Sequence, residues 1–168
     1  MNEPRWLDPE EQKTWRAYLA ASRLLFDCLD RELQRDSGIA HSYYEVLVRL
    51  SEAPGRAVRM SDLADSAQFS RSRLTHAVQR LEDLGWVRRQ ECPTDRRGAF
   101  AVLTDKGFAA LEAAAPSHVE SVRRNLFDQL TPDDVEHLRG ISEKLVQHLG
   151  GTDCLAGTAS DCLEGCSG

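Results

Sequence analysis

Residues 60–86 read MSDLADSAQFSRSRLTHAVQRLEDLGW and predict two short helices in quick succession. Ser61 is the predicted N-cap of the first helix and Ser70 that of the second, while Gly85 supplies the left-handed position that ends the second. The apolar positions are Leu63, Ala64 and Ala67 in the first helix, and Leu74, Ala77, Val78, Leu81 and Leu84 in the second. Only about three residues, 68–70, separate the pair, and so short a turn is typical of a helix-turn-helix unit.

The exposed side of the second helix is rich in hydrogen-bond donors. With the cap, its polar positions are Ser70, Arg71, Ser72, Arg73, Thr75, His76, Gln79 and Arg80. Acidic residues occur only at its far end, at Glu82 and Asp83. A helix N-terminus favours anions, and arginine and glutamine make paired hydrogen bonds to purine edges. The pattern favours a helix that enters the major groove of DNA; the alternative is a solvated helix face that is basic by chance.

Two strands are predicted next, at residues 86–91 and 99–103, and residues 92–98 bridge them. The bridge lies within CPTDRRGAF (residues 92–100) and is longer than a two-residue hairpin turn, so its tip should project. Adjacent Arg96 and Arg97 gain little from packing there, whereas a narrow minor groove attracts an inserted guanidinium. Asp95 is placed to pair with one arginine and to orient it. A merely solvated turn is the alternative.

Longer helices flank this region on both sides. Residues 10–36 show helical apolar spacing without an internal proline or glycine, and Gly38 should end that helix. A second helix is predicted from a cap at Ser42 to the stop at Pro54-Gly55.

After the strands, Thr104 should cap a helix that Pro116 kinks or interrupts. The last helix should open at Thr131, with a proline and two acids in its first turn. Its apolar stripe is Val135, Leu138, Ile141, Leu145 and Leu149.

Charge and composition narrow the protein class. The 168 residues carry a net charge of −6, but residues 51–100 hold nine arginines against seven acids, so the remaining chain carries −8. This segregation suggests one basic face on an acidic body; the alternative is ordinary scatter. An acidic N-terminal segment and the lack of a long apolar run predict a cytoplasmic protein without a membrane span, in which the five cysteines are free thiols.

Residues 60–107 resemble the winged helix-turn-helix of the MarR (multiple antibiotic resistance regulator) family of bacterial transcription regulators. The resemblance rests on the helix pair, on Asp95-Arg96-Arg97 at the wing tip, and on Val102-Leu103-Thr104 followed by Gly107. It implies a mainly α fold with a small β-hairpin wing and N- and C-terminal dimerisation helices. The divisions expected are a dimerisation helix at 1–41, the DNA-binding domain at 42–104, dimerisation helices at 105–150 and a disordered tail at 151–168.

The resemblance also implies how such a protein works. It implies a homodimeric repressor of double-stranded DNA, with recognition helices in successive major grooves of an inverted repeat. Arg97 would be the inserted wing arginine, Asp95 its orienting partner and Arg96 a phosphate contact. His76 stands where relatives often have arginine, which puts base preference there in question.

A small aromatic or phenolic effector that releases DNA is a further implication of the resemblance. Polar-tipped aromatic side chains that are candidates to line its crevice are Trp15, Tyr18, His41, Tyr43 and Tyr44, although such residues are more often core. One alternative is a redox switch that uses Cys28 or Cys92, since arginines near Cys92 would depress its pKa. Another is a winged-helix protein-interaction module without DNA binding.

Enzymatic and metal chemistry find no support in the motifs. The sequence has no G-x-S-x-G elbow, no glycine-rich phosphate loop and no HExxH helix, so we expect no catalytic residues and no cofactor. Cys154, Cys162 and Cys166 lack a paired CxxC spacing, and no metal site is predicted from them.

Overall fold

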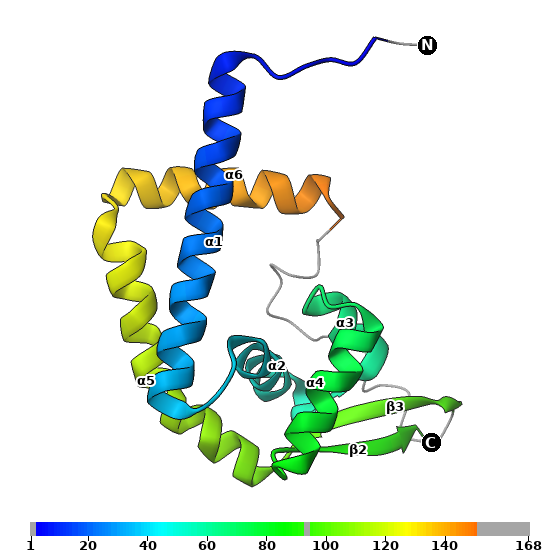
Figure 1. Ribbon diagram of the computed structural model, residues 1–168. Coiled ribbons are helices and arrows are strands. Elements are labelled where there is room, and N and C mark those ends of the chain that lie inside the picture. The colour runs from blue at the N-terminus through cyan, green and yellow to red at the C-terminus, as the bar shows by residue number, and fades with distance from the viewer. Residues whose placement is uncertain (1–2, 93–94, 151–168) are drawn as a thin grey trace.

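The computed structural model describes residues 3–92 and 95–150, without the side chains of residues 92 and 95–97. The tail predicted over residues 151–168, with its three cysteines, lies outside the described residues. Figure 1 shows two regions: a winged unit of short helices and a small sheet, and a frame made by the long helices α1, α5 and α6. This confirms the predicted fold class, a mainly helical winged helix-turn-helix with long N- and C-terminal helices.

The first helix, α1 (Pro9–Ser37), is bounded as its sequence predicts. Asp8 forms a capping box with Glu11 at one end, and Gly38 adopts a left-handed conformation at the other. Much of its length is exposed, and only Leu29 and Leu33, in its last third, are buried. The C-terminal part of α1 therefore anchors it to the rest of the molecule.

Helix α2 (His41–Glu52) passes through the centre of the core. Its N-cap is Ala40, so the predicted cap at Ser42 is wrong. The reason is tertiary, because Asp30 of α1 accepts the hydrogen bond from the His41 N–H at 2.8 Å. A turn of 3₁₀-helix, η1 (Pro54–Arg56), follows Ala53, as the predicted Pro-Gly stop requires.

The helix-turn-helix consists of α3 (Met60–Ser66) and α4 (Arg71–Asp83). Ser70 caps α4 as predicted, since its side chain accepts from the Arg73 N–H at 3.2 Å. Ser61 does not cap α3: it lies inside the helix, and its hydroxyl donates to Asp62. Leu84 is likewise not a core residue of α4, because it follows the helix and is 44% exposed.

The sheet has three antiparallel strands in the order β1-β3-β2. They are β1 (Ala57–Arg59), β2 (Val87–Cys92) and β3 (Asp95–Leu103). The sequence interpretation missed β1 and placed 92–98 in a loop. That loop is wrong, because β3 begins at Asp95 and pairs with β2 out to Cys92, with a register shift between Glu91 and Cys92. The wing is therefore a longer paired hairpin than predicted.

Helix α5 (Asp105–Asn125) joins the wing to the frame. Thr104 caps it as predicted, by accepting from the Gly107 N–H at 3.0 Å. Pro116 lies within the helix and does not interrupt it, although α5 changes direction along its length in Figure 1. A 3₁₀ turn, η2 (Phe127–Gln129), leads to α6 (Pro132–His148), whose cap at Thr131 is also confirmed.

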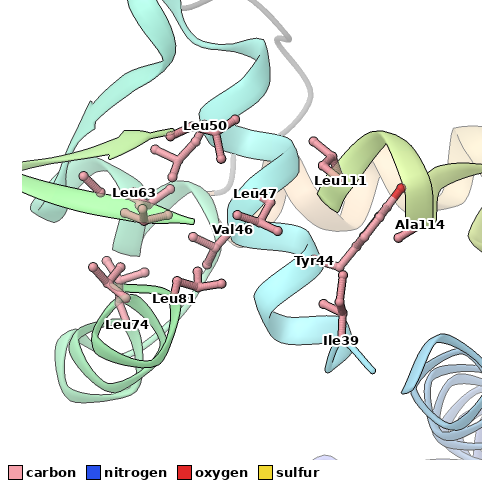
Figure 2. Close-up of a cluster of buried hydrophobic side chains, with 14 of the residues drawn as sticks. Ile39, Tyr44, Val46, Leu47, Leu50, Leu63, Leu74, Leu81, Leu111 and Ala114 are labelled. Atoms are coloured by element: carbon pink, nitrogen blue, oxygen red, sulfur yellow. The ribbon is translucent and has the colours of Figure 1, made fainter. Parts of the chain in front are cut away.

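One hydrophobic core holds the winged unit together. Figure 2 shows Val46, Leu47 and Leu50 of α2 between side chains of α3 and α4 on one side and of α5 on the other. Leu63, Leu74 and Leu81 are each no more than 1% exposed, so the two helices of the motif are fixed by their apolar faces. Their polar faces are thereby turned outward. No helix in the described part of the chain is long and apolar enough to cross a membrane.

Candidate nucleic-acid interface

Helix α4 turns its donor-rich face to solvent because its opposite face is fully used by the core. Leu74, Ala77, Val78 and Leu81 are buried, each 3% exposed or less. The seven predicted contact positions within the helix are all exposed: Arg71, Ser72, Arg73, Thr75, His76, Gln79 and Arg80. The structure therefore brings the predicted helix residues together on one open surface.

The N-terminal turn of α4 is ordered by contacts among its own side chains. The hydroxyls of Ser70 and Ser72 lie 3.2 Å apart, and the Arg73 guanidinium lies 4.3 Å from the centre of the Phe69 ring. Thr75 donates its hydroxyl proton to the Arg71 carbonyl at 2.8 Å. Stacking on Phe69 limits the rotamers of Arg73, so this side chain would lose less entropy on binding an anion.

A shallow pocket of about 330 Å³ lies between the helix-turn-helix and the wing. Its walls are the start of α3, the start of α4 and Gly98 and Ala99 of β3. Arg59 and Arg71 contribute cations to its lining. The wing and α4 thus border one shallow concave surface that has Arg59 and Arg71 in its lining.

The wing residues of the prediction lie at the start of β3. Asp95, Arg96 and Arg97 are strand residues, and Asp95 pairs with Cys92 of β2. Their side chains, like that of Cys92, lie outside the described residues. The backbone places them at the end of the hairpin that is remote from α5, as Figure 1 shows.

Arg89 of β2 is a residue of this surface that sequence reasoning did not single out. Its guanidinium donates to Gln79 Oε1 at 3.1 Å and to the Thr75 carbonyl at 3.2 Å, and it lies 3.3 Å from Glu82. The acids at the far end of α4 are therefore partnered by cations, because Arg80 also lies 3.8 Å from Asp83. The alternation of side chains along a strand predicts that Arg88 and Arg89 lie on opposite faces of β2. It does not predict which of the two contacts α4.

The candidate effector residues do not form a single group. Trp15 and Tyr18 stack on each other on α1, with ring centres 6.2 Å apart, and both are more than 50% exposed. His41 and Tyr44 of α2 instead contact His118 of α5, at ring distances of 5.4 and 4.5 Å. Tyr43 packs against the core as a partly buried residue.

His118 was not predicted as a site residue, because a single histidine within a helical pattern does not by itself indicate a binding site. Its Nδ1 atom is buried and has no hydrogen-bond partner among the described residues. Burial and the neighbouring His41 lower the pKa of His118, and burial raises the pKa of Tyr44. The α2–α5 junction thus holds a cluster of polar-tipped rings, consisting of His41, Tyr44 and His118.

The described cysteine side chain and the possible metal ligands do not extend the surface formed by α4 and the wing. Cys28 is partly buried in α1, in its C-terminal half, as its sequence position indicates. In the part of the chain that the structure describes, no three His, Cys, Asp or Glu side chains are grouped to hold a metal ion.

Comparisons with known proteins support the same interpretation of the fold. Residues 37–98 match the model of the MarR family. Among curated proteins, the chain is 32% identical over 93 residues to the transcriptional regulator PecS of Dickeya dadantii, and this alignment covers 55% of each chain. It is 30% identical over 112 residues to PrsX of Escherichia coli, which covers 67% of each. The chain therefore spans about half of PecS and two thirds of PrsX.

Two solved structures from Streptomyces coelicolor are similar over nearly their whole length. Sco3205, a MarR family transcriptional regulator in complex with DNA, is 50% identical with a TM-score of 0.85, over 92% of this chain and 97% of Sco3205. AbsC, also a MarR family transcriptional regulator, is 44% identical with a TM-score of 0.82, over 89% of this chain and all of AbsC.

Proposed function

The chain belongs to the MarR family, and we propose that it regulates transcription by binding double-stranded DNA rather than by catalysing a reaction. The observation that carries the proposal is the exposed face of α4, where cations, hydroxyls and an amide gather without an acid over the first eleven residues of the helix. The crystallised relative Sco3205, half identical in sequence, is itself bound to DNA.

The proposed docking follows from the position of α4 beside the wing. Helix α4 enters the major groove, where Ser72, Gln79 and neighbouring side chains meet base edges. The hairpin β2–β3 lies over the adjoining minor groove. In this proposal Arg97 inserts into that groove, Asp95 orients it, and Arg96 binds phosphate.

We further propose a twofold dimer that acts as a repressor on an inverted repeat. Apolar residues of α1, of α6 and of the α6 C-cap that are more than 40% exposed support this dimer: Trp15, Leu24, Ile141, Leu145 and Leu149. Such a surface on a single chain is typical of an interface. A dimer reads half-sites about one helical turn apart, roughly 10 base pairs.

The proposed effector is a small aromatic or phenolic compound that releases DNA. The support is the cluster of His41, Tyr44 and His118 where α2 of the DNA-binding unit meets α5 of the frame. A ligand that binds there would act on the angle between the two regions. Trp15 and Tyr18, which stack on each other on α1, are separate candidates to line an effector crevice.

Salt-dependent binding to duplexes selected from random sequence tests the DNA proposal. The logarithm of the binding constant should fall with the logarithm of salt concentration by about 0.9 per neutralised phosphate. Arg97→Ala should weaken binding by about 1–3 kcal/mol, whereas Arg96→Ala should lower the salt slope by roughly 1. A winged-helix module that serves only protein partners would show no DNA titration at all.

A further inference from the structure

The contact between Arg89 of β2 and Gln79 of α4 bears on the base preference of α4. We infer that Arg89 is a positioning residue that turns the Gln79 carboxamide so that its oxygen faces the wing, and that it thereby disfavours the paired contact of Gln79 with adenine. This inference rests on the proposed DNA binding. It adds a specificity determinant that lies on a strand and acts through a residue of the recognition helix.

The orientation of the Gln79 amide follows from the chemistry of its two neighbours. Arg89 Nη1 lies 3.1 Å from Gln79 Oε1, and a guanidinium can only donate. On the other side, Gln79 Nε2 lies 3.2 Å from Asp83 Oδ1, and an ionised carboxylate can only accept. The reversed amide would face a donor with a donor and an acceptor with an acceptor. Both contacts therefore select the same orientation.

Arg89 is itself held in place from several directions. Its guanidinium also donates to the Thr75 carbonyl at 3.2 Å and pairs with Glu82 at 3.3 Å. Its backbone N–H donates to Glu82 Oε1 at 2.8 Å, so the same carboxylate binds both parts of the residue. The side chains of Arg89 and Glu82 are only 32% and 23% exposed. Partial burial reduces screening by solvent and makes the arrangement persistent.

The consequence concerns what Gln79 offers to a base. A glutamine that binds adenine in the major groove uses its oxygen for the adenine amino group and its nitrogen for N7. In this chain Oε1 already accepts from Arg89, and one hydrogen of Nε2 is directed at Asp83. One lone pair of Oε1 and one hydrogen of Nε2 remain. The guanidinium 3.1 Å from Oε1 repels a second donor such as the adenine amino group, whereas the free N–H suits an acceptor such as guanine O6 or thymine O4. Gln79 should therefore favour acceptors over adenine at the base pair it meets.

Arg88 provides a matched control on the same strand. It carries the same charge, but its guanidinium donates to Gln90 at 3.0 Å and points away from Gln79, because neighbouring residues of a strand face opposite sides. Arg89→Met removes the contacts with Gln79, Thr75 and Glu82, whereas Arg88→Met removes the same charge and only the contact with Gln90. Arg89→Lys keeps a cation beside Glu82 while losing the fork that joins Gln79 and Thr75, so it serves if the methionine variant does not fold.

The first measurement needs no DNA. Nitrogen-15 relaxation and hydrogen exchange of the Gln79 side-chain amide in the full-length protein should show an ordered group. In Arg89→Met and Arg89→Lys the amide should become mobile, while Arg88→Met leaves it ordered. A mobile Gln79 amide in the unaltered protein would overturn the positioning role.

The second measurement compares four duplexes that differ only at the base pair whose preference Gln79→Ala removes. Arg89→Met should raise the relative affinity for adenine there by about 10-fold, Arg88→Met should leave it unchanged, and Arg89→Met/Gln79→Ala should match Gln79→Ala alone. If both arginine variants lost the same affinity for all four duplexes, the role of Arg89 in base preference would be overturned. If the unaltered protein binds no duplex, the proposed function fails, whereas the relaxation measurement still decides whether Arg89 orients Gln79.

Discussion

The charge state of His118 is coupled to folding because its ring is partly buried. Its Nδ1 atom is buried without a hydrogen-bond partner among the described residues, and its ring lies against Tyr44 and His41. Burial penalises the imidazolium and lowers the pKa of His118 below its ordinary value of 6.5. In mild acid, His118 is therefore protonated in a smaller fraction of folded molecules than of unfolded molecules.

The free energy of unfolding should consequently fall as the pH drops from about 6.5 toward the lowered pKa of His118, and level off below it. Urea unfolding between pH 8 and pH 5 measures this dependence. His118→Phe keeps a ring of similar size and removes the titration, so its stability should vary less over the same interval. A pH dependence that is identical in the two proteins would show that other groups cause it.

Capping residues show how far local sequence determines structure at this scale. Ser70 and Thr104 cap their helices as predicted, because each precedes its helix and accepts from an N–H three residues on. Ser42 and Ser61 have equally suitable neighbours but lie inside helices. At α2 the decisive contact comes from Asp30, eleven residues before the N–H that it accepts from. Arg89 and His118 escaped prediction for the same reason, since their partners lie on other elements.

The junction of α5 with the wing depends on the absence of a side chain at Gly107. A Cβ atom there would lie 2.1 Å from the Trp86 carbonyl oxygen and 2.9 Å from Leu103 Cδ1. The same carbonyl accepts from the Thr104 N–H and hydroxyl, so it cannot move freely. The glycine of the family motif is thus explained by a close approach of two backbones.

Gly107→Ala should therefore destabilise the protein by about 1–3 kcal/mol, because the first turn of α5 must shift away from Trp86. Gly140→Ala is the control, since a Cβ atom there has no neighbour within 4 Å and the helix should gain up to about 1 kcal/mol. Chemical denaturation of both variants gives the comparison. Equal stability of the two would contradict the close contact.

Glu32 joins α1 to α5. Its carboxylate accepts hydrogen bonds from the buried Ser121 hydroxyl, from Arg124 at 2.7 Å and from Asn125 at 3.3 Å. The Ser121 hydroxyl is the main cause that lowers the pKa of Glu32, and Arg124 adds to it. A single carboxylate thereby ties the C-terminal third of α1 to the second half of α5.

Glu32→Ala should lower the free energy of unfolding by about 1–3 kcal/mol, because Ser121 would be left buried without its acceptor. Arg31→Ala on the same turn is exposed and should change stability by no more than about 0.5 kcal/mol. Urea unfolding followed by far-ultraviolet circular dichroism measures both. Similar effects of the two substitutions would mean that this link does not stabilise the frame.

Sequence patterns predicted the helices of this fold better than its sheet. The helices have apolar repeats over several turns, and their ends lie within a few residues of the predicted ones. Strand β1 has only three residues, Ala57–Arg59, too few to show alternation. The N-terminal part of β3 contains Gly98 and two arginines, and its strand conformation follows from pairing with β2. Such pairing depends on a neighbouring strand rather than on local propensity.

At the scale of the whole molecule, the unpartnered surface of the frame is the dominant feature. Helix α6 has no buried residue. Its stripe of Leu138, Ile141 and Leu145, which Leu149 continues at the C-cap, is 40–79% exposed. Figure 1 shows α6 beyond the end of α5 that is far from the wing. A second copy that covers this end would leave both α4 helices and both wings free for DNA.

Ile141→Asp and Leu145→Asp should each place a charge in the proposed interface and convert the dimer to a monomer, because burial of an unpaired carboxylate is strongly unfavourable. Gln147→Asp introduces the same charge on the opposite face of α6 and should leave the dimer intact. Sedimentation equilibrium gives the mass. Loss of the second half-site contact should weaken binding to an inverted repeat by at least about 100-fold, while the affinity for an isolated half-site stays the same. Aspartate variants that keep full affinity for the repeat would show that α6 is not the interface. An unaltered protein that sediments as a monomer would show in addition that α4 reads DNA as a single copy.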